Sequence, residues 1–366
     1  MKTRSEQVAA HRPHYQDELA HGLARFFEPP RRTCPWCASP RLRERLRTTN
    51  HPQRKPGSFV LDTCHNCGHV FQNPRLSAEG LDFYYRDCYD GLGEATMARM
   101  ASSPLAVKLY RTRARAMLPY GRPGRWLDVG TGHGHFCAEA QRLHPGTEFH
   151  GLDWGEGVEI AARNGRIARA FRGSFPGLAG QLAGQYDVVS MYHYLEHTLA
   201  PRHELAAART VLRTGGHLLV EVPDPQSAAA RLLGRWWGPW LQPQHLHLVP
   251  LDNLRGELAE QGFTVVAVDR KEPHIPTDLT SAAVNVLNSV LPGEDLPWLP
   301  RKPGPLGRGV RALALLAATP ALLVLLGVDL LLAPLTRRTR LSNAYRVIAR
   351  RDQEACPGTS CCAAVE

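Results

Sequence analysis

A glycine-rich turn between an apolar strand and a helix constrains the fold of this chain more than any other feature. The strand is Trp126–Val129, glycines follow at 130, 132 and 134, and Phe136 opens a helical segment. Glycine lets the backbone take positive φ and approach a ligand closely, and a helix that begins there presents free N–H groups. The turn therefore predicts a βα unit with a ligand site at the carboxyl end of the strand.

The spacing of the three glycines argues against a dinucleotide site. A dinucleotide fingerprint has its third glycine three places after the second, but His135 stands there and Gly134 comes one residue early. Asp128 also fits poorly beside a pyrophosphate and well beside a cation. The turn therefore favours a ligand with an amino-acid end, and the alternative is a tight turn that binds nothing.

Short apolar runs alternate with segments of helix length from Arg125 onward. This alternation predicts βαβ units and a mostly parallel sheet with helices on both faces. The expected strands are WLDV, EFHGLD, YDVVSMY, HLLVEVP, FTVVAVD and, after a long interruption, YRVIAR. The expected helices are Phe136–Leu143, Gly157–Asn164, Pro201–Leu212 and Leu251–Gln261.

These motifs together resemble class I S-adenosylmethionine-dependent methyltransferases. LDVGTGHGHF is similar to the first motif of that family. Gly151–Trp154 resembles the end of the family's second strand, Tyr186–His197 resembles its fourth strand, and Leu212–Leu218 resembles the turn before its fifth strand. The family often has proline where Thr214 stands. The resemblance covers about residues 120–270 and the last strand. It implies a seven-stranded Rossmann-like sheet and S-adenosylmethionine as the methyl donor.

The resemblance also implies which residues bind the donor. Asp153 ends a strand, where a carboxylate accepts hydrogen bonds from ribose hydroxyls, and Asp128 lies toward the ammonium group. Trp154 either flanks the adenine or fills the core. The full expected set is Asp128, Gly130, Thr131, Gly132, Gly134, Phe136, Asp153, Trp154, Ser174 and Met191.

Candidate acceptor-side residues gather at two places. A sulfonium methyl group is already activated, so a general base is needed only where the acceptor must lose a proton. The candidates are Tyr192, His193, Glu196 and His197 at the end of one strand, and His245 and His247 in the loop after the next. The last two are expected to point the same way, as substrate contacts, metal ligands or structural histidines. His197 and His245 are the first candidates, and Glu196 alternatively caps the following helix.

Two Cys-x-x-Cys pairs precede the core. Cys34 and Cys37 are separated from Cys64 and Cys67 by 26 residues, at positions 38–63. Four thiolates close a tetrahedral structural zinc site with no open position for chemistry. A redox pair and an iron–sulfur cluster are the alternatives.

The segment with the two cysteine pairs, residues 31–75, is interpreted as a zinc ribbon, and it adds a second, more specific resemblance to known methyltransferases. Val70–Ser77 and the Tyr84-Tyr85 pair resemble the zinc-binding domain of bacterial sugar methyltransferases, which implies a small-molecule, sugar, or glycan- or lipid-linked acceptor. The long C-terminal domain of those enzymes is not expected here. The alternatives are a ribosomal RNA methyltransferase with a zinc ribbon and a non-catalytic protein on the same fold. A net charge of +10 permits RNA, but no compact basic patch is interleaved with aromatic residues, which disfavours nucleic acid.

An apolar segment, Ala312–Leu335, interrupts the core before its last strand. It is long enough to cross a bilayer, and arginines flank it at 308, 311, 337, 338 and 340. Because it falls between two strands of one sheet, both of its ends must stay on the same side. We expect either an interfacial helix or shallow hairpin that contacts membrane, or a buried helical pair that forms a lid or dimer face.

The composition, 43% hydrophobic and 21% charged, excludes a wholly disordered chain, a collagen and a polytopic membrane protein. The N-terminal residues have no apolar signal region, so we expect a cytoplasmic protein, peripheral on the cytoplasmic face of the membrane if 312–335 touches lipid. The sequence does not specify the oligomeric state.

Six parts are expected along the chain. They are an N-terminal arm (1–30), the ribbon (31–75), a helical connector (76–120), the core (121–270 with 344–351), the Pro-rich and apolar helical insert (271–343) and a disordered tail (352–366).

Overall fold

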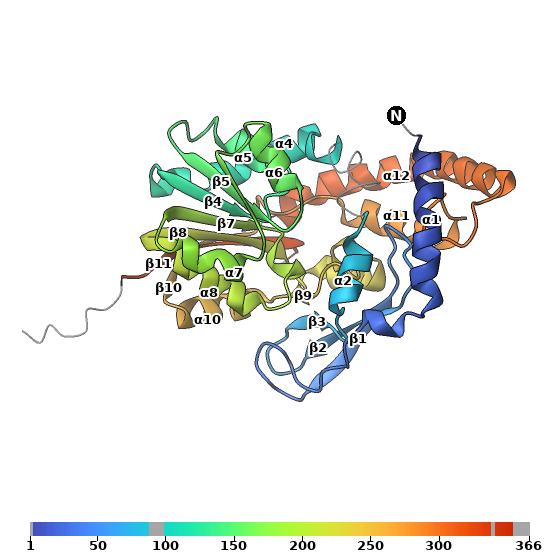
Figure 1. Cartoon of the computed structure of the whole chain (residues 1–366), viewed down its shortest axis with the longest axis horizontal. Helices are drawn as coiled ribbons and strands as arrows, with labels where there is room; N and C mark the ends of the chain where they lie inside the picture. Colours follow the sequence, from blue (N-terminus) through green and yellow to red (C-terminus); the bar gives the residue numbers. More distant parts are fainter. Residues whose placement is uncertain (1–2, 88–98, 338–340, 354–366) are drawn as a thin grey trace, which may run out of the picture.

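Two β-sheets organise the part of the chain that this computed structural model describes, residues 3–87, 99–337 and 341–353. The larger sheet has the order β10-β11-β8-β7-β4-β5-β6 (Figure 1). Its strands are β4 (Arg125–Val129), β5 (Glu148–Asp153), β6 (Arg169–Arg172), β7 (Tyr186–Tyr192), β8 (Leu212–Pro223), β10 (Phe263–Asp269) and β11 (Ala344–Arg351). The predicted tail, beyond Gln353, lies outside the described residues.

The larger sheet reverses its strand order beside β4. Strands β4 to β8 pair in parallel, whereas β11 runs antiparallel to both β8 and β10. The chain builds outward from β4 to β6 and then returns to place β7 on the other side of β4. Such a reversal opens a crevice at the carboxyl ends of the strands, where ligands bind. The expected seven-stranded Rossmann-like fold is confirmed.

The edge strand β6 was not among the strands that the apolar runs predicted. Its four residues are only partly buried or exposed, and both ends are arginines. A short edge strand packs little of its surface against the core, so it carries no continuous apolar run.

Helices cover both faces of the larger sheet (Figure 1). One face carries α4 (Pro104–Arg115), α5 (His135–Ala140) and α6 (Gly157–Arg163), and the other carries α7 (Phe175–Leu178), α8 (Pro201–Val211) and α10 (Leu251–Glu260). Each face has its own apolar core, with Trp126 on the first and Leu127 on the second. The expected helices are present, and only α5 is clearly shorter than its pattern, ending at Ala140.

The smaller sheet combines the N-terminal ribbon with a strand of the core. Its antiparallel order is β1 (Leu42–Thr48), β2 (Phe59–Cys64), β3 (Val70–Gln72) and β9 (His247–Leu248). An aromatic cluster around Tyr15 and Phe83 packs α1 (Arg4–Ala20) and α2 (Ala78–Tyr85) beside this sheet. The ribbon is therefore joined by backbone hydrogen bonds to the loop that follows β8.

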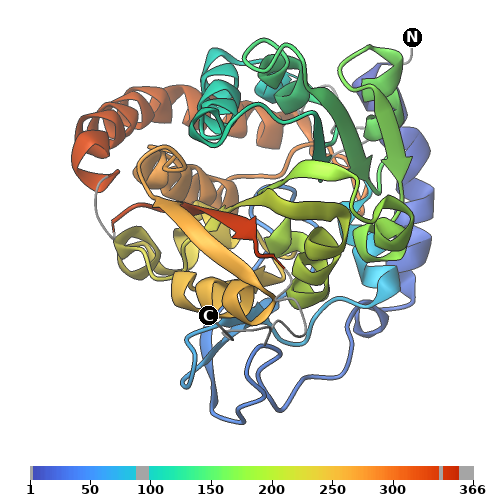
Figure 2. The ribbon, with the colours of Figure 1, turned by 90° about the vertical axis from the view of Figure 1, so that its left-hand side faces the viewer.

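The apolar insert forms one long helix rather than a hairpin. Helix α11 (Asp278–Val290) precedes α12 (Pro305–Thr336), which has 32 residues and stays helical through Pro320. In its most apolar window only 6% of residues are buried, so the helical pair is not buried within the described part of this chain, and a dimer face stays a prediction. Figures 1 and 2 both place α12 along the outside of the molecule. The insert packs through α11, and within the described ranges no residue covers the outer face of α12.

A buried ion cluster ties three elements of the core together. Glu221 on β8 accepts hydrogen bonds from Arg113 on α4, at 2.6 and 2.9 Å, and from Arg346 on β11, at 2.8 Å. Burial alone would raise the pKa of Glu221, but the two guanidinium groups hold it well below its ordinary value. The last strand is thus fixed in the sheet by charge as well as by its ladder.

Replacement of Arg346 by alanine is expected to lower the free energy of unfolding by about 3–5 kcal/mol, because it leaves part of a buried carboxylate uncompensated. Urea denaturation measures the change. Arg350→Ala, an exposed arginine on the same strand, is the matched control and is expected to stay within about 0.5 kcal/mol of the wild type. Equal losses in the two variants would contradict the role given to Glu221.

Candidate functional site

The three glycines of the turn after β4 have different tasks. All take positive φ, at 75° for Gly130, 50° for Gly132 and 73° for Gly134. A Cβ on Gly130 would lie 2.7 Å from the Tyr194 ring, and one on Gly134 would lie 2.8 Å from Ala161. A Cβ on Gly132 would meet nothing within 4 Å. Packing therefore requires glycine at the outer two positions, and the middle one borders open space that a ligand can enter.

Asp153 joins this turn to the neighbouring strand. It is the last residue of β5, and its carboxylate accepts hydrogen bonds from the backbone N–H of Gly132 and of Gly155, both at 2.9 Å. The residue is only partly buried, and each carboxylate oxygen can accept a second hydrogen bond. Asp153 can therefore accept from ligand hydroxyls beside the open position at Gly132.

Asp128 lies beneath the turn and holds it in shape. Its carboxylate is buried and accepts hydrogen bonds from the hydroxyls of Ser190 and Thr131. Burial raises the pKa of Asp128 to about 6. Thr131 and Asp128, both expected at the donor site, are thus positioning residues for the glycine turn.

The other residues expected at the donor site differ in exposure. Trp154 is 68% exposed, so the view that it fills the core is wrong, and the adenine contact stays a prediction. Phe136 and Met191 are buried in the two cores. The Ser174 hydroxyl caps α7 by accepting from Gly177 N–H at 3.1 Å.

A pair of histidines follows β7 and β8, near enough to Asp153 for its charge to act on the pKa of His197. His197, in the short helix Leu195–His197, and His245, in the loop after β8, have ring centroids 4.6 Å apart at an angle of 81°. The Nδ1 of His197 donates to Gln244 O at 3.0 Å, and that of His245 donates to Pro239 O at 2.7 Å. Because a carbonyl oxygen only accepts, the proton of each ring is on Nδ1 and the basic nitrogen is Nε2.

The two histidines differ in basicity. Burial lowers the pKa of His245 to about 3. Burial also lowers the pKa of His197, but Glu196 beside it opposes the shift. Ligand atoms of Glu196, His197 and His245 lie within 4.8 Å of one another. His197 is therefore the stronger base of the pair and is neutral at pH 7.

His193 and Tyr192 are poorly suited to act as bases. His193 lies between two carboxylates, with Nδ1 3.1 Å from Glu196 and Nε2 3.4 Å from Glu221. Burial would lower its pKa, but the two carboxylates raise it to about 9, so the ring is a cation at neutral pH. Burial raises the pKa of Tyr192, whose ring packs on Phe136.

His247 does not share a direction with His245. It belongs to β9, where its Nδ1 lies 3.0 Å from Nε2 of buried His69 and the two rings stack. The expectation of a common direction is wrong because a turn at 242–244 comes directly before His245 and the extended backbone begins only at 247. The structure assigns His247 to the packing of the ribbon.

The ribbon holds the His245 loop, a contribution that sequence patterns missed. Gln72 on β3 donates to the Gln242 side chain at 2.8 Å, and its backbone N–H donates to Leu246 O at 2.9 Å. The Tyr85 hydroxyl donates to Gln244 O at 2.8 Å and lies 3.2 Å from His197 Nδ1. The signal was present in the Val70–Ser77 run and in the tyrosine pair that follows it, but neither indicated a contact across the molecule.

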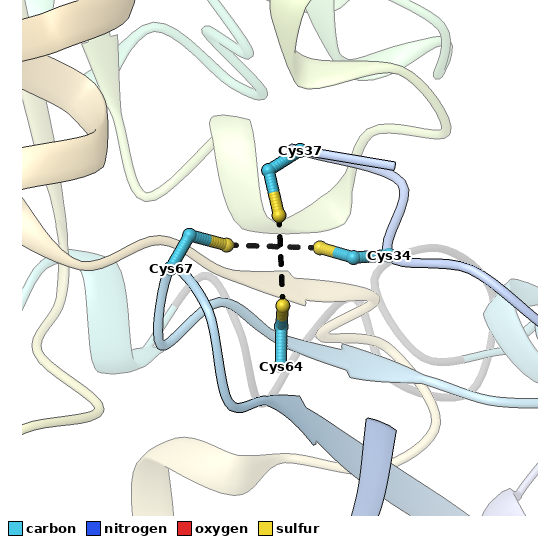
Figure 3. Close-up of side chains that lie close together, drawn as sticks. All are labelled: Cys34, Cys37, Cys64 and Cys67. Atoms are coloured by element: carbon cyan, nitrogen blue, oxygen red, sulfur yellow. Dashed lines mark hydrogen bonds between the residues drawn. The ribbon is translucent and has the colours of Figure 1, made fainter. Parts of the chain in front are cut away.

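The four cysteines converge on one point (Figure 3). Sγ of Cys34 lies 3.7 Å from that of Cys67, and Sγ of Cys37 lies 3.6 Å from that of Cys64. A disulfide needs about 2.05 Å, whereas a tetrahedral zinc with bonds of about 2.3 Å separates its sulfurs by roughly 3.8 Å. The cluster therefore fits a structural zinc ion.

Comparison with known proteins gives the same assignment for the core. Residues 103–268 match a family model described as a methyltransferase domain. The chain is 29% identical over 129 residues to the ubiquinone biosynthesis O-methyltransferase of Acinetobacter baylyi, covering 33% of this chain and 53% of that protein. It is 30% identical over 138 residues to the Marinobacter nauticus protein of the same name, covering 34% and 55%. The core of this chain is therefore similar to methyltransferase domains over residues 103–268.

This chain spans about half the length of those two curated relatives. A solved SAM-dependent methyltransferase from Archaeoglobus fulgidus aligns with 67% of this chain and 94% of its own, at 20% identity and a TM-score of 0.42. The residues of the methyltransferase domain fit the donor, because Gly132 borders open space and Asp153 offers its carboxylate beside it.

Replacement of Asp153 by alanine is expected to weaken S-adenosylmethionine binding by more than about tenfold, through loss of a two-hydroxyl contact. Isothermal titration calorimetry measures the affinity. Asp17→Ala, which removes an exposed carboxylate on α1, is expected to bind normally. Unchanged affinity in the Asp153 variant would contradict the ribose assignment.

Metal analysis of the purified protein is expected to find about one zinc per chain. The double variant Cys37→Ser/Cys67→Ser is expected to lose it, and Cys137→Ser, outside the cluster, is expected to keep it. Because the ribbon contacts the His245 loop and the donor residues lie on β4 and β5, zinc loss should leave donor affinity within about twofold. Zinc-free wild-type protein would refute the site.

Proposed function

We propose that this chain transfers a methyl group from S-adenosylmethionine to a hydroxyl oxygen of a small-molecule acceptor. The donor, when bound, supplies a methyl group already activated by its sulfonium. The observation that carries the proposal is the pair His197 and His245, whose rings meet with Nε2 as the basic nitrogen of each. A hydroxyl must lose its proton when it is methylated, and a neutral histidine can accept it.

His197 is the residue to which we give the proton. It is half-buried, so an acceptor can reach it, whereas His245 is 6% exposed and its pKa is lowered to about 3. A base with so low a pKa takes a proton less readily than one near the working pH. Glu196 favours the protonated form of His197, and His245 orients the ring through its edge-on contact.

The relatives support oxygen as the atom that is methylated. Both are named as O-methyltransferases of ubiquinone biosynthesis. The resemblance of the ribbon to that of sugar methyltransferases points to a sugar, or a glycan- or lipid-linked alcohol, within the same proposal. In each case Gln72 of the ribbon and Tyr85 of α2 fix the loop that carries His245.

His197→Gln is expected to lower kcat by about a hundredfold or more, the usual contribution of a general base, and to change donor affinity by less than about twofold. Transfer of labelled methyl to a panel of catechols, phenols and free sugars identifies a working acceptor and then measures the rate. His217→Gln, on β8 near Tyr120, is the matched control and is expected to remain active.

The pH profile separates a base from a structural residue. Because the pKa of His197 is lowered from about 6.5, wild-type kcat/KM should fall only at acid pH, as the ring becomes protonated. The glutamine variant should lose that acid limb. Equal rates for the variant and the wild type, or methyl transfer to carbon or nitrogen acceptors alone, would refute the proposal.

A further inference from the structure

The outer face of α12 is apolar, and none of the residues that the structure describes covers it. A helix on the surface of a soluble domain carries polar residues on its solvent side. Here Leu313 is 68% exposed and Leu331 is 79% exposed, and from 312 to 336 the sequence has a single charged residue, Asp329. The other exposed large apolar side chains of α12 are Leu306, Val310, Leu316, Leu323, Val324, Leu330, Leu332 and Leu335, and α11 exposes Val284, Val286 and Val290.

Asp329 does not interrupt this face because it points inward. The residue is buried, and its carboxylate accepts hydrogen bonds from Leu279 N at 3.0 Å, from Thr280 N at 2.9 Å and from the Thr280 hydroxyl at 2.7 Å. These donors belong to the first turn of α11. The one acidic residue of the segment thus docks α12 on α11 and leaves the outer surface without charge.

Both ends of α12 are attached to the body of the protein. Near its start, Arg311 donates to Pro292 O and Asn288 at 3.2 Å and to Glu294 at 3.0 Å. At its end, the Thr336 hydroxyl lies 2.9 Å from His274 Nε2. A helix of 32 residues is long enough to cross a bilayer, but one held at both ends by residues of the segment 274–294 offers a membrane its side. Figure 2 shows it running along the rim of the molecule.

The charges at the two ends of the face identify its partner. Exposed basic residues precede it at Arg301, Lys302 and Arg308, and arginine follows it at 337, 338 and 340 in the sequence. Of the nearby acids, Glu294 pairs with Arg311 and Arg4, and Asp295 pairs with Arg12 and with Lys302, so these acids add no unpaired negative charge to the end of the face. A second copy packed on this face would bring basic ends together, whereas anionic headgroups attract them.

We propose that α11 and α12 form a docking surface for an anionic lipid bilayer, with α12 lying in the plane of the interface. Helix α11 also supports the loop that carries His245, since Trp237 donates to Asp278 at 3.0 Å and Asn285 donates to Trp236 O at 3.1 Å. Docking therefore brings the loop that carries His245 to the membrane. This consequence rests on the proposed methyl transfer and indicates an amphiphilic acceptor drawn from the bilayer.

Vesicle co-sedimentation of the full-length protein tests the surface. We expect binding to phosphatidylcholine vesicles containing phosphatidylglycerol, weaker binding to phosphatidylcholine alone, and a decline with salt. Leu323→Glu/Leu331→Glu, at two exposed positions, should bind at least about tenfold more weakly. Leu118→Glu, a half-exposed leucine of the short helix Leu118–Tyr120, is the control and should bind as the wild type does.

Light scattering and donor calorimetry on the same samples complete the test. A wild-type protein that ignores the anionic vesicles, or a double variant that binds them unchanged, would overturn the proposal. So would a dimer that the double variant converts to monomer without any vesicle binding, because a second copy would then cover the face. Donor affinity should be equal in the wild type, the double variant and the Leu118→Glu control. If the wild type binds the vesicles but transfers no methyl group, that result would count against the proposed function and not against the docking surface.

Discussion

Glu221 is the buried charge on which the arrangement of the core depends. It accepts from Arg113 on α4 and Arg346 on β11, and it lies 3.4 Å from His193. His193 in turn contacts Glu196, the neighbour of His197. One buried carboxylate on β8 therefore connects a covering helix, the last strand and the segment that carries His197. Such a cluster tolerates few arrangements, because each unpaired charge in it would be costly to bury.

The histidine pair His197 and His245 comes from two parts of the chain that are distant in sequence. His197 comes from the short helix after β7, and His245 comes from a loop whose next residues form β9 in the ribbon sheet. The ribbon thus acts as a template for that loop, and the cysteine cluster packs against Phe71, which pairs with His247 of β9. A zinc ion held by the four cysteines would have a structural task, since four ligands leave no position for a substrate.

Much of the fold was predictable because periodicity and glycine spacing report local backbone requirements. The parallel strands, the turn after Val129 and the two Cys-x-x-Cys pairs were found this way. The edge strand Arg169–Arg172 escaped because it buries almost no apolar surface. The contacts of Gln72 and Tyr85 escaped because they join residues more than a hundred positions apart, and a single sequence carries no record of such proximity.

The sequence by itself determined the chemistry that is available: a strand–glycine turn–helix unit with an acid on the next strand, four thiols and an apolar segment ahead of the last strand. Only the tertiary structure decided which histidine meets which partner. His193 became a cation between two carboxylates, His247 packed on His69, and Asp329 turned inward to leave an apolar face outside. The physical reason is that burial and neighbouring charge set the pKa and the exposure of a side chain, and both arise from residues that the local sequence does not contain.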